Sequence, residues 1–164
     1  MREKTKNVIL YLIGKLGSKI EGRKKLMKLM FLIEHFDLES GRIVRKHTLG
    51  NRFFIYYYGV FSFDVMNSYE ELIREGKIGE RCLLTSDRSV MLSPALPSEN
   101  HRRVEIRLDE ELRRVVDGII EKFGDCTGYD LEVKTLRMLG IEPFEKDQYF
   151  GKEVDEVLKE KCED

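Results

Sequence analysis

Three histidines, His35, His47 and His101, are the side chains of this chain best suited to bind a metal or to move a proton near neutral pH. They lie apart in the sequence, and no second His or Cys stands at a metal-ligand spacing from His35. Pairs of carboxylates fall on helix faces that we expect to be exposed. Acid and base catalysis by two carboxylates needs environments that give them different pKa values, and an exposed face does not provide this. Signatures of a Ser or Cys nucleophile are absent. The sequence therefore predicts a protein that is not an enzyme and that uses no metal or other cofactor.

The three cysteines, Cys82, Cys126 and Cys162, stand at least 36 residues apart and form no CxxC pair. Such spacing favours neither a zinc ribbon nor a disulfide framework. The chain has no run of about 18 apolar residues that would cross a membrane, and its N-terminal apolar stretch lacks a small-residue cleavage site. We therefore expect a soluble, cytoplasmic protein without a membrane partner.

Residues 14–19 (GKLGSK) superficially resemble a phosphate-binding loop. That loop needs four residues between its glycines and a Lys followed by Ser or Thr after the second glycine, so that backbone N–H groups surround a phosphate. Here two residues separate the glycines, Ser precedes Lys, and a predicted helix rather than a strand comes before the segment. We reject a nucleotide-binding site on these grounds.

The 164 residues include 29 Lys and Arg against 30 Asp and Glu, but the two signs are distributed unevenly. Residues 1–52 hold 13 bases and 5 acids, whereas residues 109–164 hold 9 bases and 17 acids. Three explanations are open: the basic segment binds an acidic or nucleic-acid partner, the basic and acidic segments attract each other within the fold, or they drive head-to-tail association. We favour attraction within the fold. Abundant Lys, Arg and Glu beside the single glutamine Gln148 are typical of proteins from hot-living prokaryotes, so we also hypothesise a thermophilic source.

The second predicted helix begins near Arg23 and has a broad apolar face, so we expect it at the centre of the fold. Its first turn carries four bases, Arg23, Lys24, Lys25 and Lys28, although the N-terminal end of a helix disfavours positive charge. We interpret this local cost as a sign that the four bases bind a partner, either an acidic protein or a nucleic acid. On this interpretation, replacing Lys24 and Lys25 by Glu leaves the fold intact. The alternative is that acids after Asp109 fold back and pair with the turn.

The rest of the pattern predicts several helices and a few short strands. The expected elements are a helix at 5–16, a strand at 53–58 ended by Gly59, a helix capped by Ser62 and ended near Gly76, strands at 77–84 and 89–92 around the turn at 85–88 and closed by Pro94 and Pro97, and helices at 109–123, 127–139 and 150–162. Spacing in the helix at 109–123 places Ile120 at the centre of its inner face. This order predicts a mostly helical α+β fold, a single domain over residues 1–164 with a small antiparallel sheet.

A helix followed by a two-stranded hairpin, as expected over residues 62–92, is the core of a winged-helix domain. On that template the helix at 62–76 would enter the major groove of DNA. Its polar face carries four acids against the single base Arg74, which would repel the phosphate backbone. Contact with DNA would therefore use the basic turn of the second helix instead.

Three short motifs resemble the Panacea domain family, whose members are antitoxin-like and phage-associated. Residues 25–33 (KLMKLMFLI) resemble the family's KLxKLlYla helix. Residues 57–65 (YYGVFSFDV) are similar to its YGPvS signature, with Val60 in the place of the proline, and residues 123–132 (FGDCTGYDLE) to its kyg-xxs/t-xx-eL stretch. The similarity extends over about residues 8–140 and leaves residues 141–164 as a C-terminal helical extension.

The resemblance implies a non-catalytic module that binds and neutralises a toxin protein, with a toxin encoded nearby as its partner. On this view Tyr57, Tyr58 and Phe61 join the four bases in an aromatic and basic binding surface. The residues alone leave a second interpretation open, in which these aromatic side chains pack into the core. We therefore expect an antitoxin-like protein-binding module, and the alternative is a winged-helix-like transcriptional regulator that binds DNA.

Overall fold

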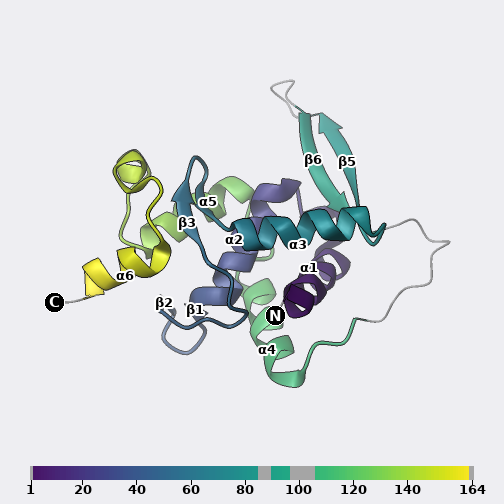
Figure 1. Ribbon diagram of the computed structural model, residues 1–164, viewed down its shortest axis with the longest axis horizontal. Coiled ribbons are helices and arrows are strands. Elements are labelled where there is room, and N and C mark those ends of the chain that lie inside the picture. The colour runs from purple at the N-terminus through teal and green to yellow at the C-terminus, as the bar shows by residue number, and fades with distance from the viewer. Residues whose placement is uncertain (1, 85–89, 97–105, 163–164) are drawn as a thin grey trace.

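Helix α2 (Gly22–His35) lies at the centre of the molecule, as its broad apolar face predicts. The computed structural model describes residues 2–84, 90–96 and 106–162, and in it α1, α3, α4 and α5 surround α2 (Figure 1). Every apolar side chain of α2 from Leu26 to Ile33 is at most 4% exposed. From Lys25 to His35 every residue of the helix is buried, so this part of α2 has no solvent face on which to place a polar side chain.

The other elements form a mostly helical α+β domain whose strands pair as antiparallel hairpins of two in the described part of the chain, as the sequence predicts. They are α1 (Arg2–Leu16), η1 (Gly17–Lys19), β1 (Phe36–Asp37), β2 (Arg42–Ile43), β3 (Phe54–Tyr56), β4 (Gly59–Phe61), α3 (Phe63–Arg74), β5 (Gly79–Leu84), β6 (Val90–Ala95), α4 (Glu110–Phe123), α5 (Gly128–Met138), η2 (Pro143–Tyr149) and α6 (Val154–Cys162). None of the described helices combines the length and the apolar character needed to cross a bilayer.

The aromatic run at residues 53–58 forms half of a hairpin, so the prediction of one strand ended by Gly59 is wrong. Strand β3 turns at Tyr57 and Tyr58, and β4 begins at Gly59, which lies opposite Tyr56. Gly59 has a φ of +89°, a conformation that favours glycine at such a tight turn. The turn was missed because two tyrosines occupy it instead of the usual polar turn residues.

Helix α3 is followed directly by the β5–β6 hairpin, which is the order expected of a winged-helix domain, and the hairpin projects from the helical body (Figure 1). The Ser62 side chain caps α3 by accepting a hydrogen bond from the N–H of Val65 at 3.2 Å, as predicted. Pro94 does not close the hairpin, because β6 continues to Ala95 and pairs Pro94 with Glu80. Among the described strands β6 pairs only with β5, so the missing N–H of Pro94 is tolerated there. The predicted turn at 85–88 and Pro97 lie outside the described residues.

The last helix is shorter than the predicted helix at 150–162, because α6 begins only at Val154. A short 3-10 helix, η2, comes before it. Residues 151–154 instead run along the outer edge of β3. The N–H of Gly151 donates to the carbonyl oxygen of Ile55 at 2.8 Å, and the N–H of Ile55 donates to the carbonyl oxygen of Lys152 at 2.9 Å. The N–H of Val154 donates to the carbonyl oxygen of Phe53 at 2.8 Å. This backbone pairing fixes the start of α6 against the hairpin.

Helix α4 confirms the predicted element but corrects its phase. Ile119 is fully buried, whereas Ile120 is only partly buried on the flank of the helix. The buried stripe follows positions i, i+4, i+7 and i+11, namely Leu112, Val116, Ile119 and Phe123. Ile120 therefore does not lie at the centre of the inner face. The sequence pattern included it because an apolar flank residue has the same periodicity as the stripe.

The corrected phase predicts that Ile119→Ala lowers the free energy of unfolding by about 2–5 kcal/mol, since it leaves a cavity in a fully packed core. The neighbouring Ile120→Ala is the matched control, with the same atoms deleted from a partly exposed site, and its cost should be less than half as large. Urea denaturation of the two variants and the wild type measures both losses. An equal or larger loss for Ile120→Ala would contradict this assignment of the inner face.

Candidate partner-binding surface

The four bases of the predicted basic turn occupy different environments. Arg23 forms a bidentate ion pair with Glu80 of β5, with both N–O distances at 2.6 Å. The hydroxyl of Tyr69 donates to the same carboxylate at 2.7 Å. The hydrogen bond from Arg23 lowers the pKa of Glu80 and keeps that carboxylate ionised. Arg23 therefore joins α2 to the β5–β6 hairpin.

Lys24 is the most accessible lysine of the turn and is bound by the acidic half of the chain. Its Nζ lies 2.5 Å from Oε1 of Glu132 on α5. The same ammonium group lies over two tyrosine rings, 5.0 Å from the centroid of Tyr58 and 5.9 Å from that of Tyr129. The alternative in which acids after Asp109 pair with the basic turn is thus confirmed at Lys24.

Lys25 and Lys28 are buried, with 3% and 2% of their surfaces exposed. The Lys25 ammonium donates to the carbonyl oxygens of Lys19 at 2.8 Å and Gly124 at 2.6 Å. The Lys28 side chain donates to the carbonyl oxygen of Val60 at 2.7 Å. Burial lowers the pKa of both lysines, and that of Lys28 falls to about 7. The prediction that all four bases present one basic surface is therefore wrong, because the burial of α2 turns Lys25 and Lys28 inward.

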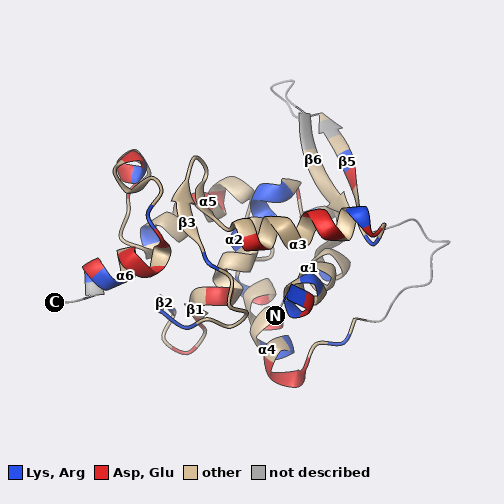
Figure 2. Ribbon diagram, in the orientation of Figure 1, with Lys and Arg blue, Asp and Glu red and all other residues tan. Residues whose placement is uncertain are grey.

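The favoured interpretation, attraction between the basic N-terminal and the acidic C-terminal segment, is confirmed in part, because three ion pairs join residues 1–52 to residues 109–164. Bases of the first 52 residues pair with acids that come later in the chain, and acids and bases lie side by side along α6 (Figure 2). These pairs are Arg2–Glu71, Lys6–Glu71, Lys6–Glu75, Lys19–Asp125, Arg23–Glu80, Lys24–Glu132 and Arg52–Glu153.

Two of the three predicted aromatic residues project into solvent at the tip of the β3–β4 hairpin. Tyr57 is 74% exposed and Tyr58 is 68% exposed, while Phe61 is partly buried. The interpretation that places these side chains in the core is therefore wrong for both tyrosines. Instead, the core side of the hairpin is formed by Ile55 and Val60, which lie opposite each other and are fully buried.

The outer face of this hairpin collects aromatic rings from three segments of the chain. Phe54 and Phe61 lie opposite each other in the register, and Tyr56 lies two residues along β3 on the same face. Neighbouring ring centroids are 4.8 to 6.0 Å apart throughout the group. We define the aromatic surface as Phe54, Tyr56, Tyr57, Phe61, Phe63 and Phe150.

Four residues of the aromatic surface were not predicted from the sequence, namely Phe54, Tyr56, Phe63 and Phe150, of which Phe63 is 53% exposed and Phe150 is 43% exposed. Phe63 opens α3 and its ring lies 5.4 Å from that of Tyr56. Phe150 reaches Tyr57 from a segment 93 residues later, with centroids 4.8 Å apart. Alternation along β3 was the available signal for the outer face, but no local pattern pairs Phe150 with it.

Two bases at the rim of the aromatic surface already have partners within the fold. The Arg52 guanidinium lies 5.4 Å from the centroid of the Phe54 ring and forms a bidentate pair with Glu153, at 3.0 and 2.9 Å. Lys146 donates to the carbonyl oxygen of Tyr57. Because these bases have partners, the face is suited to an apolar surface of another molecule rather than to a polyanion.

Three side chains with metal-binding groups meet between the end of α2 and the start of α6. His35, His47 and Asp155 each offer one ligand atom, and these atoms lie within 4.8 Å of one another. The histidines are separate in the sequence, as described above, but the fold brings two of them together. His101 lies outside the described residues.

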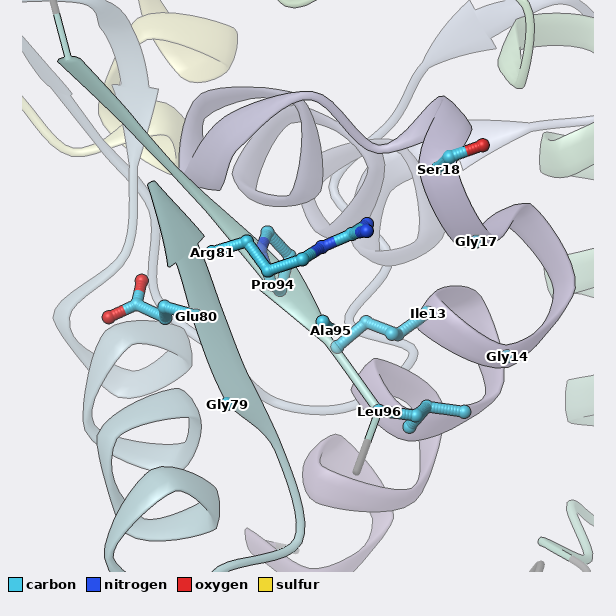
Figure 3. Close-up of a pocket in the computed structure, with 10 residues that line it drawn as sticks. All are labelled: Ile13, Gly14, Gly17, Ser18, Gly79, Glu80, Arg81, Pro94, Ala95 and Leu96. Atoms are coloured by element: carbon cyan, nitrogen blue, oxygen red, sulfur yellow. The ribbon is translucent and has the colours of Figure 1, made fainter. Parts of the chain in front are cut away.

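A shallow hollow lies between the end of α1 and the base of the β5–β6 hairpin (Figure 3). The segment rejected as a phosphate loop lines it through Gly14, Gly17 and Ser18. Arg81 extends along the hollow, whereas the Glu80 carboxylate points away from it (Figure 3). The rest of the lining is largely apolar, so the hollow offers no group of side chains for chemistry.

Comparisons of the chain with protein-family models, with curated proteins and with solved structures found no match. The resemblance to the Panacea family stays a prediction that rests on the three motifs.

The position of Lys25 reverses the expectation for charge reversal at the basic turn. Lys25→Glu would place a carboxylate against the carbonyl oxygens of Lys19 and Gly124, so we expect a loss of about 1–3 kcal/mol in the free energy of unfolding. Lys19→Gln is the matched control, because Lys19 is exposed and its ion pair with Asp125 is worth at most about 1 kcal/mol. Thermal melts compare the two, and an undisturbed Lys25→Glu variant would contradict the buried contacts.

The lowered pKa of Lys28 predicts a specific dependence of stability on pH. Between pH 7 and about 10 the unfolded chain holds a proton on Lys28 that the folded chain has released, so this residue makes stability rise with pH. Below pH 7 both states are protonated and the contribution is constant. The free energy of unfolding of wild type minus that of Lys28→Met should rise by up to about 1.4 kcal/mol per pH unit above pH 7.

Chemical denaturation between pH 6 and 9.5 measures this difference. Lys122→Met, on the exposed side of α4, controls for the loss of one positive charge. A difference between wild type and Lys28→Met that does not change with pH would show that Lys28 keeps its proton when the protein is folded.

Proposed function

We propose that this protein is a non-enzymatic binding module that recognises another protein through the aromatic surface. The observation that carries the proposal is the two-sided β3–β4 hairpin, whose inner residues are fully buried while its outer face holds partly or largely exposed aromatic rings. Exposing contiguous apolar area to water is unfavourable, and such patches mark interaction sites. Tyrosine and other aromatic side chains supply much of the binding energy where a partner covers them.

The distribution of charge supports a protein partner over DNA. A DNA-binding surface needs several free bases to neutralise phosphates. In the basic turn, Arg23 and Lys24 are paired with acids and Lys25 and Lys28 are buried. Helix α3, the element that a winged helix would place in the major groove, carries Glu71 in ion pairs with α1, two further acids, Asp64 and Glu70, and a fourth, Glu75, directly after its end.

The Panacea resemblance adds a class of partner to this proposal. Its implied activity is the neutralisation of a toxin protein, which requires a stable surface for protein recognition and no catalytic group. Tyr57 and Tyr58 lie in the motif that carries the resemblance and also at the exposed tip of the hairpin. We therefore propose an antitoxin-like role in which the partner is a protein encoded by a neighbouring gene.

Co-expression of the tagged chain with the product of each flanking gene tests the proposal. We expect one product to co-purify, and the double variant Tyr57→Ala with Phe63→Ala to weaken its affinity by at least about 30-fold, the equivalent of about 2 kcal/mol from one well-buried aromatic anchor. Both side chains are largely exposed, so their truncation should leave the melting temperature of the free protein nearly unchanged.

Tyr129→Ala is the matched control, because Tyr129 is 68% exposed but lies on α5 outside the aromatic surface. It should retain the partner. Equal retention of the partner by the double variant would overturn the assignment of the surface. Retardation of duplex DNA that weakens steeply between about 50 and 200 mM salt, with no protein retained, would establish the regulator instead.

A further inference from the structure

His35, His47 and Asp155 converge from three parts of the chain that are distant in sequence. His35 is the last residue of α2, His47 belongs to the segment between β2 and β3, and Asp155 lies in the first turn of α6. One ligand atom from each lies within 4.8 Å of the other two. Two imidazoles and one carboxylate are a common donor set for divalent transition metals, and they leave a coordination position open.

The imidazole of His35 is prepared to bind a metal through Nε2. Its Nδ1 donates a hydrogen bond to the carbonyl oxygen of Val44 at 3.0 Å, which fixes the neutral tautomer with the lone pair on Nε2. The ring packs against Phe31 and Phe53, with centroids 5.3 and 6.1 Å away, and the residue is 1% exposed. Burial lowers the pKa of His35, which favours the neutral, ligating form.

Asp155 and His47 complete the group from the side of the solvent. Oδ2 of Asp155 lies 2.8 Å from Nε2 of His47. Oδ1 of Asp155 is shielded from solvent and receives no hydrogen bond from the residues that the structure describes. A buried carboxylate oxygen without a donor is costly in an apolar setting, and a bound cation would satisfy it.

Hydrogen bonds to the backbone fix two of the segments that carry these three residues. The neighbouring Glu34 carboxylate accepts hydrogen bonds from the N–H groups of Leu49, Gly50 at 3.2 Å and Asn51 at 2.7 Å, which orders the segment that follows His47. The N–H of Val154, next to Asp155, donates to the carbonyl of Phe53. The segment that follows His47 and the start of α6 are thus positioned by contacts that do not involve the ligand atoms.

We propose that His35, His47 and Asp155 form a site for one divalent transition-metal ion, with Zn²⁺ as the best match, bound by both imidazoles, the carboxylate and a water molecule. Tetrahedral Zn²⁺ has bonds of about 2.0–2.1 Å to nitrogen, so its ligand atoms must come within about 3.3 Å of one another. Rotation of the partly exposed His47 and Asp155 side chains toward His35 achieves this. The ion would link the end of α2 to the start of α6 and thereby stabilise the fold.

Titration of the EDTA-treated, full-length protein with Zn²⁺ or Co²⁺ alone tests the site. We expect one ion per chain, a higher melting temperature on addition of Zn²⁺, and a Co²⁺ spectrum without a thiolate charge-transfer band, which separates this site from the cysteines. His47→Gln and Asp155→Asn should each weaken Zn²⁺ binding at least tenfold. Glu156→Gln, an exposed neighbour on the same turn of α6, should bind like the wild type.

Histidine ring ¹⁵N spectra of the wild type give a readout that does not depend on how the variants fold. Binding of Zn²⁺ should shift Nε2 of His35 and leave its Nδ1 protonated. Unchanged His35 and His47 resonances at saturating Zn²⁺, or equal affinity in the wild type and both ligand variants, would overturn the proposal.

Discussion

Burial of α2 from Lys25 to His35 is the constraint on which most of this structure depends. The helix carries ionisable side chains into the core, where each needs a hydrogen-bond partner because water is excluded. Backbone groups of other segments fill that need, with Lys25 bound to the carbonyls of Lys19 and Gly124, Lys28 to that of Val60, Glu34 to the N–H groups of residues 49–51 and His35 to the carbonyl of Val44. The polar groups of one helix therefore position several connecting segments.

The contact between Lys28 and Val60 links the core to the proposed binding surface. The backbone N–H and carbonyl of Ile55 form hydrogen bonds with residues 152 and 151. Ile55 and Val60 are therefore a non-hydrogen-bonded pair, and the Val60 carbonyl points away from β3. The side chain of Lys28 donates a hydrogen bond to that carbonyl oxygen. The hairpin is thus held on its inner face and along one edge, while its outer face is left for the aromatic rings and, in our proposal, for a partner protein.

Two of the six residues of the aromatic surface, Tyr57 and Phe61, were predicted from the sequence. Tyr57 and Phe61 stand in one motif, and the alternation of Phe54, Ile55 and Tyr56 along β3 is a local pattern that indicates its outer face. Phe150 becomes a neighbour of Tyr57 only through the pairing of residues 151–154 with β3. The bases of α2 were misassigned for a related reason, since a lysine has the same sequence signature whether its ammonium group meets water or a buried carbonyl.

The sequence by itself determined the mostly helical α+β class, the cap at Ser62 and the central place of α2. These features follow from apolar periodicity and from hydrogen bonds within a few residues. Only the tertiary structure decided that Lys25 and Lys28 face inward and that His35 and His47 meet Asp155. Such contacts join residues up to 120 positions apart, and they are set by how helices pack, which no local spacing records.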